Sequence, residues 1–393
     1  MKPARLIFSL TLTLCLLEAG SRLLFPRPEL ENFNRIYYTP LKLFGGIGNA
    51  PAGLQPISYT RLRWESAPDG FSNILTLNIY GFRGPDFPAR PASKPRIIFI
   101  GDSMAEGLGA DDGDTLPAQF ERLAGGRYEV LNLGVSGTGL PDYARLARDS
   151  RVLQPTALVI VTSWNDLPVR TEWAVEQEPP GPIRFSAAGS NFLAAIDELR
   201  HGRRPMTSLY SGPFPFFRAV PDSSNPFSGR QNEHGVDPDI FRAMRAGRFN
   251  PFVSNAARSS QELVLQEMSE ASHGPFIDAV SEAARLNGAD LYFIHIPLHV
   301  TVSDRYYPLW NRLGEDFTVP TLTGPEFRRH QALFAQYLAS RDIPFIDATP
   351  ALSDLEKSGR QLFHGYDEHL NAAGYGEVAR LALAQIESAA ARK

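Results

Sequence analysis

Cysteine is almost absent from this chain, because Cys15 is the only one among 393 residues. A single cysteine excludes an internal disulfide framework and leaves no cysteine and histidine group with the spacing of zinc ligands. The HExxH pattern of zinc-dependent proteases is also missing. The sequence therefore implies no metal and no cofactor.

An excess of basic charge is missing as well. Lysine and arginine total 39 against 43 acidic residues, which gives a formal net charge of −4. A nucleic-acid-binding surface needs clustered basic side chains, so nucleic acid is not an expected partner. With 43% hydrophobic and 21% charged residues, the composition is that of an ordinary globular protein.

The N-terminus carries a long hydrophobic run. Lys2 and Arg5 precede apolar residues over 6–17, the order of basic and hydrophobic regions in an export signal. With its flanks this segment reaches roughly 20 residues, about enough to span a bilayer. Residues 1–25 are therefore predicted to be an uncleaved signal-anchor, which holds the rest of the chain in the periplasm or outside the cell. A cleaved signal peptide with a small-x-small site at 19–21, giving a secreted protein, and a buried amphipathic helix are the alternatives.

Three further regions follow the N-terminal segment. Residues 26–94 begin rich in proline and glycine and continue with two strand-like stretches, so we expect a tether and an extension. Residues 95–393 are expected to form the main domain. Within it, residues 168–272 mix arginine, proline and aromatic residues without a clear period and are predicted to be a large insertion.

The main domain alternates short apolar stretches with helical ones. Its first stretch, RIIFIG at 96–101, is apolar after its first residue, which is typical of a strand buried on both faces of a parallel sheet. The alternation predicts an α/β fold with a doubly wound parallel sheet and helices on both faces. Ligands bind beyond the carboxyl ends of the strands in such folds. Polar residues and glycines gather there, at 101–103, 132–134 and 164–166.

These strand ends supply the parts of a nucleophilic site. A serine hydroxyl needs a base to remove its proton, and His369, just before the last helix, is placed to return to the same edge as Ser103. Asp367 lies two residues earlier, on the same side of an extended segment, and would orient the imidazole. An oxyanion hole is available from the backbone N–H groups of Ser103 and Gly134 and from the amide of Asn165.

At these residues the sequence resembles the SGNH hydrolases, also called GDSL esterases and lipases. The serine block matches at 101–103, the glycine block at Gly134, the asparagine block at 165–166 and the histidine block at 369–371. The extension at 78–88 also resembles one found before the serine block in exported bacterial members. The resemblance implies a flavodoxin-like, three-layer α/β/α fold and an esterase without a cofactor. It further implies that the residues named above are the nucleophile, the base and the oxyanion donors.

Two positions depart from the family pattern. Glycine usually stands two residues before the oxyanion asparagine, where this chain has Ser163. The orienting acid commonly stands three residues before the histidine, where this chain has Tyr366. Asp367 is the best substitute, and Glu368 and Asp347 stay open as alternatives.

Structural interpretations compete with these roles. Asp102 and Ser103 can cap backbone N–H groups of a strand-to-helix turn, and Gly134 can serve a tight turn. Asn165 can satisfy backbone groups. Asp102 and Asp166 are expected to be structural rather than catalytic.

The predicted function is a serine-dependent hydrolase of esters, acting on O-acyl groups of a cell-envelope polysaccharide or on a lipid ester. An O-acyltransferase that uses the same residues and a non-catalytic glycan-binding or assembly protein are the alternatives. We expect the insertion at 168–272 to form a partly helical cap, since aromatic and arginine side chains suit stacking on sugars and contacts with acidic groups. A packed insertion without such a role, or one that faces the membrane, is the structural alternative.

Overall fold

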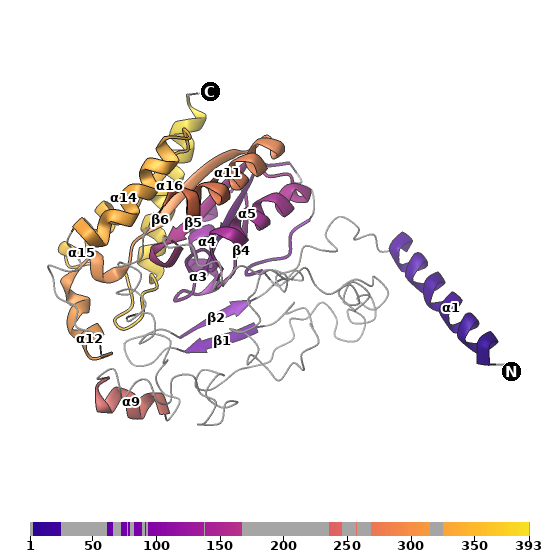
Figure 1. The fold of residues 1–393 in the computed structure, drawn as a ribbon, viewed down its shortest axis with the longest axis horizontal. Helices are drawn as coiled ribbons and strands as arrows, with labels where there is room; N and C mark the ends of the chain where they lie inside the picture. The colour runs from indigo at the N-terminus through magenta and orange to yellow at the C-terminus, as the bar shows by residue number, and fades with distance from the viewer. Residues whose placement is uncertain are drawn as a thin grey trace.

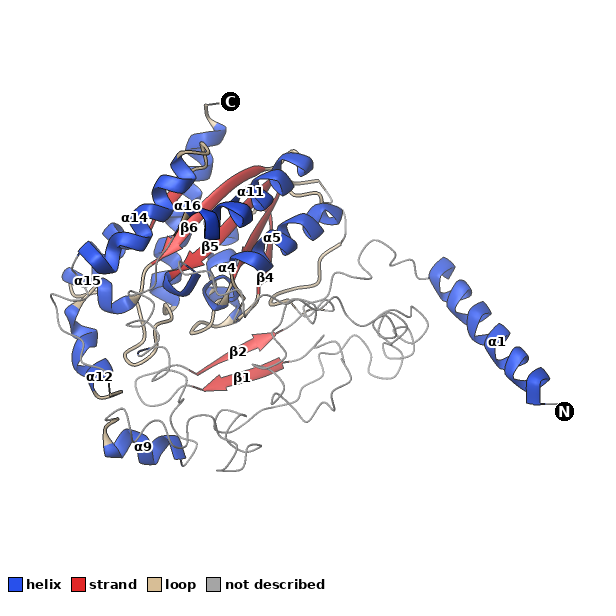
Figure 2. Cartoon of the chain, in the orientation of Figure 1, coloured by secondary structure: helices blue, strands red, loops and turns tan. Residues whose placement is uncertain are grey.

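The computed structural model contains a five-stranded parallel sheet in the order β4-β3-β5-β6-β7 (Figures 1 and 2). The strands are β3 (Arg96–Gly101), β4 (Glu129–Gly134), β5 (Ala157–Ser163), β6 (Asp290–Ile296) and β7 (Phe345–Asp347). The structure describes residues 3–24, 61–65, 72–76, 78, 82–88, 91, 93–136, 138–166, 236–245, 257, 269–314 and 325–392.

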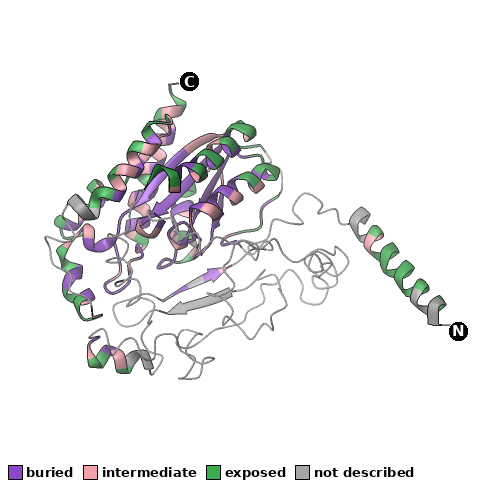
Figure 3. Ribbon diagram, viewed as in Figure 1, coloured by how far each residue is buried: buried purple, intermediate pink, exposed green. Residues whose placement is uncertain are grey.

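Helices cover both faces of this sheet (Figure 1). They are α4 (Leu116–Leu123), α5 (Leu140–Asp149), α11 (Glu270–Asn287), α14 (Pro325–Ala339), α15 (Thr349–Lys357) and α16 (Ala372–Ala390). Ile97 and Phe99 of β3 point to the face covered by α4 and α16, whereas Ile98 and Ile100 point to the face covered by α5, α11 and α14. Because both faces are covered, the strands are apolar on both sides and form the buried centre of the domain (Figure 3). The doubly wound α/β fold predicted from the sequence is confirmed.

The winding direction changes at β3. The chain runs from β3 to β4 on one side of the sheet and then returns to place β5 on the other side of β3. In open α/β sheets such a reversal leaves a crevice outside the carboxyl ends of the strands, where ligands bind. The carboxyl end of β3 leads directly into Ser103, so the topology places this residue at the expected ligand-binding edge.

The N-terminal extension packs into the α/β domain. β1 (Arg61–Glu65) and β2 (Ser72–Thr76) form a separate antiparallel pair. Beyond them, Phe82 is fully buried in the core on the α5 side of the sheet, and Phe87 joins the same core. This part of the extension is therefore integral to the domain, although the sequence places a boundary near residue 94. The predicted tether at 26–60 lies outside the described residues.

The N-terminal segment forms one helix, α1 (Pro3–Leu24), whose apolar side chains are exposed to solvent. Phe8 and Leu10 are among the most exposed large hydrophobic residues of the described chain. Among the described helices, none combines the length and the apolar character needed to cross a membrane. The signal-anchor over residues 1–25 thus stays a prediction.

Only two parts of the predicted insertion are described before its end at α11. α9 (Pro238–Arg245) contributes Ile240 to the core on the α4 side, and Ala257 joins the same core. Asp237 accepts a 3.0 Å hydrogen bond from Nε of Arg312, which follows α12 (Tyr307–Asn311). The rest of the predicted cap over 168–272 lies outside the described residues.

Candidate active site

Ser103 is presented by a tight strand-to-helix turn. β3 ends at Gly101, and the short helix α3 (Ser103–Glu106) begins with the serine itself. Asp102 caps this helix, because its Oδ1 accepts a 2.9 Å hydrogen bond from the N–H of Met104. A Cβ at position 101 would lie 2.5 Å from the carbonyl oxygen of Val161 in the neighbouring strand, so only glycine fits there. The turn thereby holds the serine at the carboxyl edge of the sheet.

His369 reaches Ser103 from the loop before α16. The side chain of Asn371 caps α16 by accepting hydrogen bonds from Ala373 N and Gly374 N, at 2.9 and 3.0 Å. The cap fixes the loop just before the helix, and Nε2 of His369 lies 2.7 Å from Oγ of Ser103. The serine and the histidine, 266 residues apart in the sequence, are therefore within direct hydrogen-bond distance.

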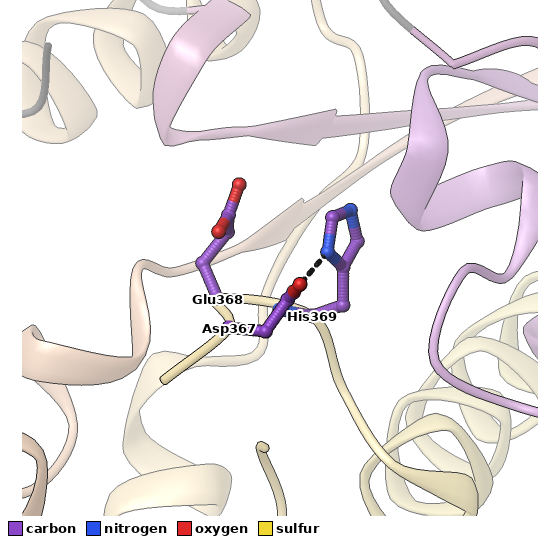
Figure 4. A group of neighbouring side chains, drawn as sticks. All are labelled: Asp367, Glu368 and His369. Atoms are coloured by element: carbon purple, nitrogen blue, oxygen red, sulfur yellow. Dashed lines mark hydrogen bonds and ion pairs between the residues drawn. The ribbon is translucent and has the colours of Figure 1, made fainter. Parts of the chain in front are cut away.

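Asp367 holds the other side of the imidazole ring. Its Oδ1 accepts a hydrogen bond from Nδ1 of His369 and a second, 3.0 Å long, from the backbone N–H of His369 (Figure 4). Both residues are buried, with exposed fractions of 3% for Asp367 and 8% for His369. The three residues form one line of hydrogen bonds from carboxylate to imidazole to hydroxyl, which is the arrangement that activates a serine.

The charges of Asp367 and His369 support the role of His369 as the general base. Burial alone would lower the pKa of His369, but the charge and the hydrogen bond of Asp367 outweigh it and raise that pKa above its ordinary value. Burial would also raise the pKa of Asp367, and the neighbouring His369 lowers it instead. The pair thus favours a carboxylate beside an imidazolium, the charge state that forms when the serine gives up its proton.

The two alternative acids do not contact the imidazole in this way. Figure 4 shows the carboxylate of Asp367 pointing toward the His369 ring and bonded to it, whereas Glu368 lies beside the ring without such a bond. Loss of hydration and the nearby charge of Asp367 raise the pKa of Glu368 to about 7. Asp347 accepts a 2.9 Å hydrogen bond from the N–H of Thr349 at the end of β7. The geometry therefore favours Asp367 as the orienting acid.

Gly134 ends β4 beside the serine turn. Its N–H donates a 2.9 Å hydrogen bond to the side chain of Asn132, two residues earlier. A Cβ on Gly134 would lie 2.1 Å from the backbone nitrogen of Glu106, so α3 packs directly on its Cα. The glycine therefore has a packing role here, and its predicted role as an oxyanion donor stays a prediction.

Asn165 lies beside the serine turn, in the single turn η4 (Trp164–Asp166) after β5. Oγ of Ser163, at the position where the SGNH pattern has glycine, contacts Oδ1 of Asn165 and lies 2.9 Å from Oδ2 of Asp102. Ser163 thus contacts both Asn165 and Asp102. Ser163 therefore ties the asparagine to the turn that presents Ser103. The predicted role of the Asn165 amide as an oxyanion donor stays a prediction.

Asp102 and Asp166 are placed as the structural residues that the sequence predicts. Asp166 is buried and accepts 2.8 Å hydrogen bonds from the hydroxyl of Tyr143 and from the N–H of Ser163. Burial, together with the charge of Asp102, raises the pKa of Asp166 well above its usual range. Burial raises the pKa of Asp102 as well. Both carboxyl groups accept hydrogen bonds from backbone N–H groups at the edge of the site.

Comparison with known proteins gives a consistent but distant set of similarities. No family model matches the chain, and no curated protein matches it. Among solved structures, a member of the lipolytic protein G-D-S-L family from Veillonella parvula is 12% identical, with 74% of this chain and 96% of that chain covered and a TM-score of 0.34. A GDSL-like lipase from Bacteroides thetaiotaomicron is 14% identical, with coverages of 76% and 91% and a TM-score of 0.35.

A third solved structure is a catalytic mutant of an acetylxylan esterase from Geobacillus stearothermophilus. It is 12% identical, with 75% of this chain and 95% of that chain covered and a TM-score of 0.37. Identities and TM-scores this low carry no functional conclusion. The case for a function therefore rests on the hydrogen-bonded residues of this chain.

Proposed function

We propose that this chain is a serine-dependent ester hydrolase of the SGNH type. The observation that supports it most is the continuous line from Asp367 through His369 to Ser103, with 2.7 Å between Nε2 and Oγ. A buried histidine that contacts a serine on one side and a carboxylate on the other is costly to maintain for packing alone. In catalysis, the contact with the serine and the contact with the carboxylate both have a use.

The reaction proceeds through an acyl-enzyme. Oγ of Ser103 attacks the ester carbonyl carbon while its proton passes to Nε2 of His369, and Asp367 stabilises the imidazolium. The tetrahedral intermediate collapses, the carbon–oxygen bond to the alcohol breaks, and His369 returns the proton to the leaving alkoxide. Water then attacks the acyl carbon, again with His369 as base, which releases the acid and restores the serine.

The oxyanion is stabilised at the same turn. The N–H of Ser103 lies in the first turn of α3, where backbone N–H groups have no partner within the helix. Asn165 is the second donor in this proposal, which is supported by the contacts of Ser163 with the Asn165 side chain and with Asp102 at the nucleophile turn. Preorganised donors of this kind stabilise the developing charge without reorganising during the reaction.

The substrate class we propose is an O-acylated glycan or a lipid ester of the cell envelope. The support comes from the sequence, since the insertion at 168–272 combines aromatic and arginine side chains and the N-terminus has the order of an export signal. An acceptor hydroxyl of a sugar can replace water at the acyl-enzyme, which would make the same site an O-acyltransferase.

The test uses the full chain and p-nitrophenyl acetate, with Ser103→Ala as the matched variant. Turnover should fall by about 10³-fold or more in the variant, because a triad without its nucleophile retains only binding and oxyanion stabilisation. A fluorophosphonate probe should label the unaltered protein and not the variant. Equal turnover and labelling in both proteins would contradict the proposal. Adding acetylated and free oligosaccharides then separates hydrolysis from transfer by whether acetate or an acetylated acceptor accumulates.

Export is the second part of the proposal. The exposed apolar side chains of α1 and the basic residues Lys2 and Arg5 near its start support a role in targeting. Full-length protein should fractionate with the envelope of a bacterial host, and replacing Leu10 and Leu14 by arginine should retain it in the cytoplasm. Unchanged fractionation of the double variant would contradict export through this segment.

A further inference from the structure

The loop that follows α3 has an unusual set of hydrogen bonds. Five successive carbonyl groups, those of residues 106–110, each accept a hydrogen bond from a side chain. Gly107 and Gly109 have φ values of 88° and 89°, so the loop takes a course that other residues rarely adopt. Because residues 107–110 are neither strand nor helix and Glu106 is the last residue of α3, these buried carbonyls depend on side chains for hydrogen bonds.

Arg83 supplies three of these contacts. Its Nη1 donates to the carbonyl oxygens of Glu106 and Gly107, at 3.3 and 2.6 Å, and its Nη2 donates to that of Ala110 at 2.6 Å. Its Nε forms a 2.9 Å ion pair with Asp112, just beyond the loop. Arg83 is only 2% exposed, so the whole guanidinium is used within the protein. A lysine ammonium cannot reproduce this planar fork.

The histidine side of the site supplies the remaining contacts, apart from one by Asn132 to the Glu106 carbonyl. The hydroxyl of Tyr375 in α16 donates to the carbonyl of Leu108 at 2.7 Å, and Nε2 of His364 lies 2.8 Å from the carbonyl oxygen of Gly109. The N–H of His364 in turn donates to the carbonyl of His369. The loop therefore joins the serine turn to the segment that carries the base.

The same loop binds the serine directly. The N–H groups of Gly107 and Leu108 both donate to the carbonyl oxygen of Ser103, at 2.9 and 3.0 Å. A shift of this loop would move the peptide of Ser103 and change its distance from His369. The position of the loop therefore affects the distance between Oγ of Ser103 and Nε2 of His369, across which the proton is transferred.

The extension also anchors the residue next to Arg83. The N–H of Asn78 donates to the carbonyl of Phe82 at 2.8 Å, and its side chain accepts from the N–H of Phe82 at 3.1 Å. Phe82 is fully buried in the core on the α5 side of the sheet. Arg83 therefore follows a residue whose backbone and side chain are both held in place.

We propose that Arg83 is a positioning residue: the N-terminal extension uses it to hold loop 106–110, and through the loop Ser103, at hydrogen-bond distance from His369. The inference rests on the proposed function and adds a component to its site from outside the serine and histidine segments. It makes the extension a required part of the catalytic unit.

The test compares Arg83→Lys with Arg96→Lys in the full chain. Arg96 is an equally buried arginine that binds Glu129 and the carbonyls of Leu153 and Pro88, but it lies at the opposite end of β3 from the serine. Both changes should lower the melting temperature. Only Arg83→Lys should also lower kcat for p-nitrophenyl acetate, by about 10- to 100-fold, as expected when a reacting group is misplaced by a fraction of an ångström to 1 Å.

Two readouts separate positioning from loss of stability. KM should change little in Arg83→Lys, and the rate of fluorophosphonate labelling at Ser103 should fall with kcat. Guanidinium chloride at millimolar concentration should restore part of the activity of Arg83→Ala. It should not increase the activity of Arg96→Ala. If Arg83 variants do not fold, Tyr375→Phe removes one donor to the same loop and should lower kcat several-fold with KM unchanged.

Three results are distinguishable. If the unaltered protein shows no turnover that depends on Ser103, the proposed function is overturned and this inference with it. If the unaltered protein is active and Arg83→Lys keeps its kcat, the inference alone is overturned. If only Tyr375→Phe folds, an unchanged kcat in that variant likewise overturns the inference alone. A selective fall in kcat with guanidinium rescue would support it.

Discussion

Replacing Asp367 by asparagine is the sharpest test of the hydrogen-bonded line. The carboxylate accepts two hydrogen bonds from His369, through Nδ1 and the backbone N–H, and is almost fully buried. The amide keeps the shape and an acceptor oxygen but removes the negative charge that stabilises the imidazolium. A hydrogen bond to a charged group contributes about 1.5–3 kcal/mol. Losing the charge beside the imidazolium that forms during the reaction should therefore cost about 3 kcal/mol in the transition state, the upper end of that range.

At about 1.4 kcal/mol per tenfold change, this loss corresponds to a fall in kcat of roughly 100-fold. The pH profile should shift as well. His369 acts as a base only when neutral, so kcat/KM rises as the pH passes its pKa, which Asp367 holds above the ordinary 6.5. Removing the charge lowers that pKa, and the acidic limb of the profile should move to lower pH.

The assay is steady-state hydrolysis of p-nitrophenyl acetate from pH 5 to 9 by the unaltered protein and by Asp367→Asn. Glu368→Gln is the matched control, since it neutralises the adjacent carboxyl group without touching the imidazole. We expect it to change kcat by less than about tenfold, in keeping with an indirect charge effect. A large loss in Glu368→Gln together with near-normal kcat in Asp367→Asn would show that the acid is misassigned.

Three further changes test how the site is built. Gly134→Ala should lower the melting temperature measured by circular dichroism, because its Cβ would lie 2.1 Å from the nitrogen of Glu106 and overpacking costs about 1–3 kcal/mol; an unchanged melting temperature would contradict the packing role. Phe82→Ala should lower the free energy of unfolding in urea by about 3–5 kcal/mol, since the ring is fully buried, and a change below 1 kcal/mol would contradict its place in the core. Asp166→Asn should be tolerated within about 1 kcal/mol, because burial favours the neutral form of this acid, whereas Asp166→Ala leaves the Ser163 N–H unpaired and should cost about 1–3 kcal/mol. Equal urea midpoints for the two Asp166 variants would contradict that account.

The sheet and the pairing of serine with histidine could be predicted from the sequence for physical reasons. Strands buried on both faces are apolar at nearly every position, so β3 and β5 stand out from their surroundings. The carboxyl ends of parallel strands share one edge, which brings residues at strand ends together whatever their distance in the sequence. The spacing of Asp367 and His369 is local, and local geometry already allows the carboxylate to reach the ring.

The remaining contacts depend on packing that the sequence pattern does not encode. The N–H of Gly134 donates to the side chain of Asn132, a contact that strand alternation does not predict. Asparagine side chains favour such local contacts with the backbone. The role of Arg83 could not be predicted from the sequence, because its hydrogen-bond partners lie 23–29 residues further along the chain and follow no regular pattern.

The 266-residue separation between Ser103 and its base sets the order in which activity can arise during synthesis. The serine turn and the strand that precedes it can form early, whereas the segment with His369 is synthesised 266 residues later. Contacts between such distant parts of a chain form late in folding. The Ser103 hydroxyl therefore has no base in any nascent or truncated form that ends before residue 369, and the proposed activity would report only chains that extend beyond it.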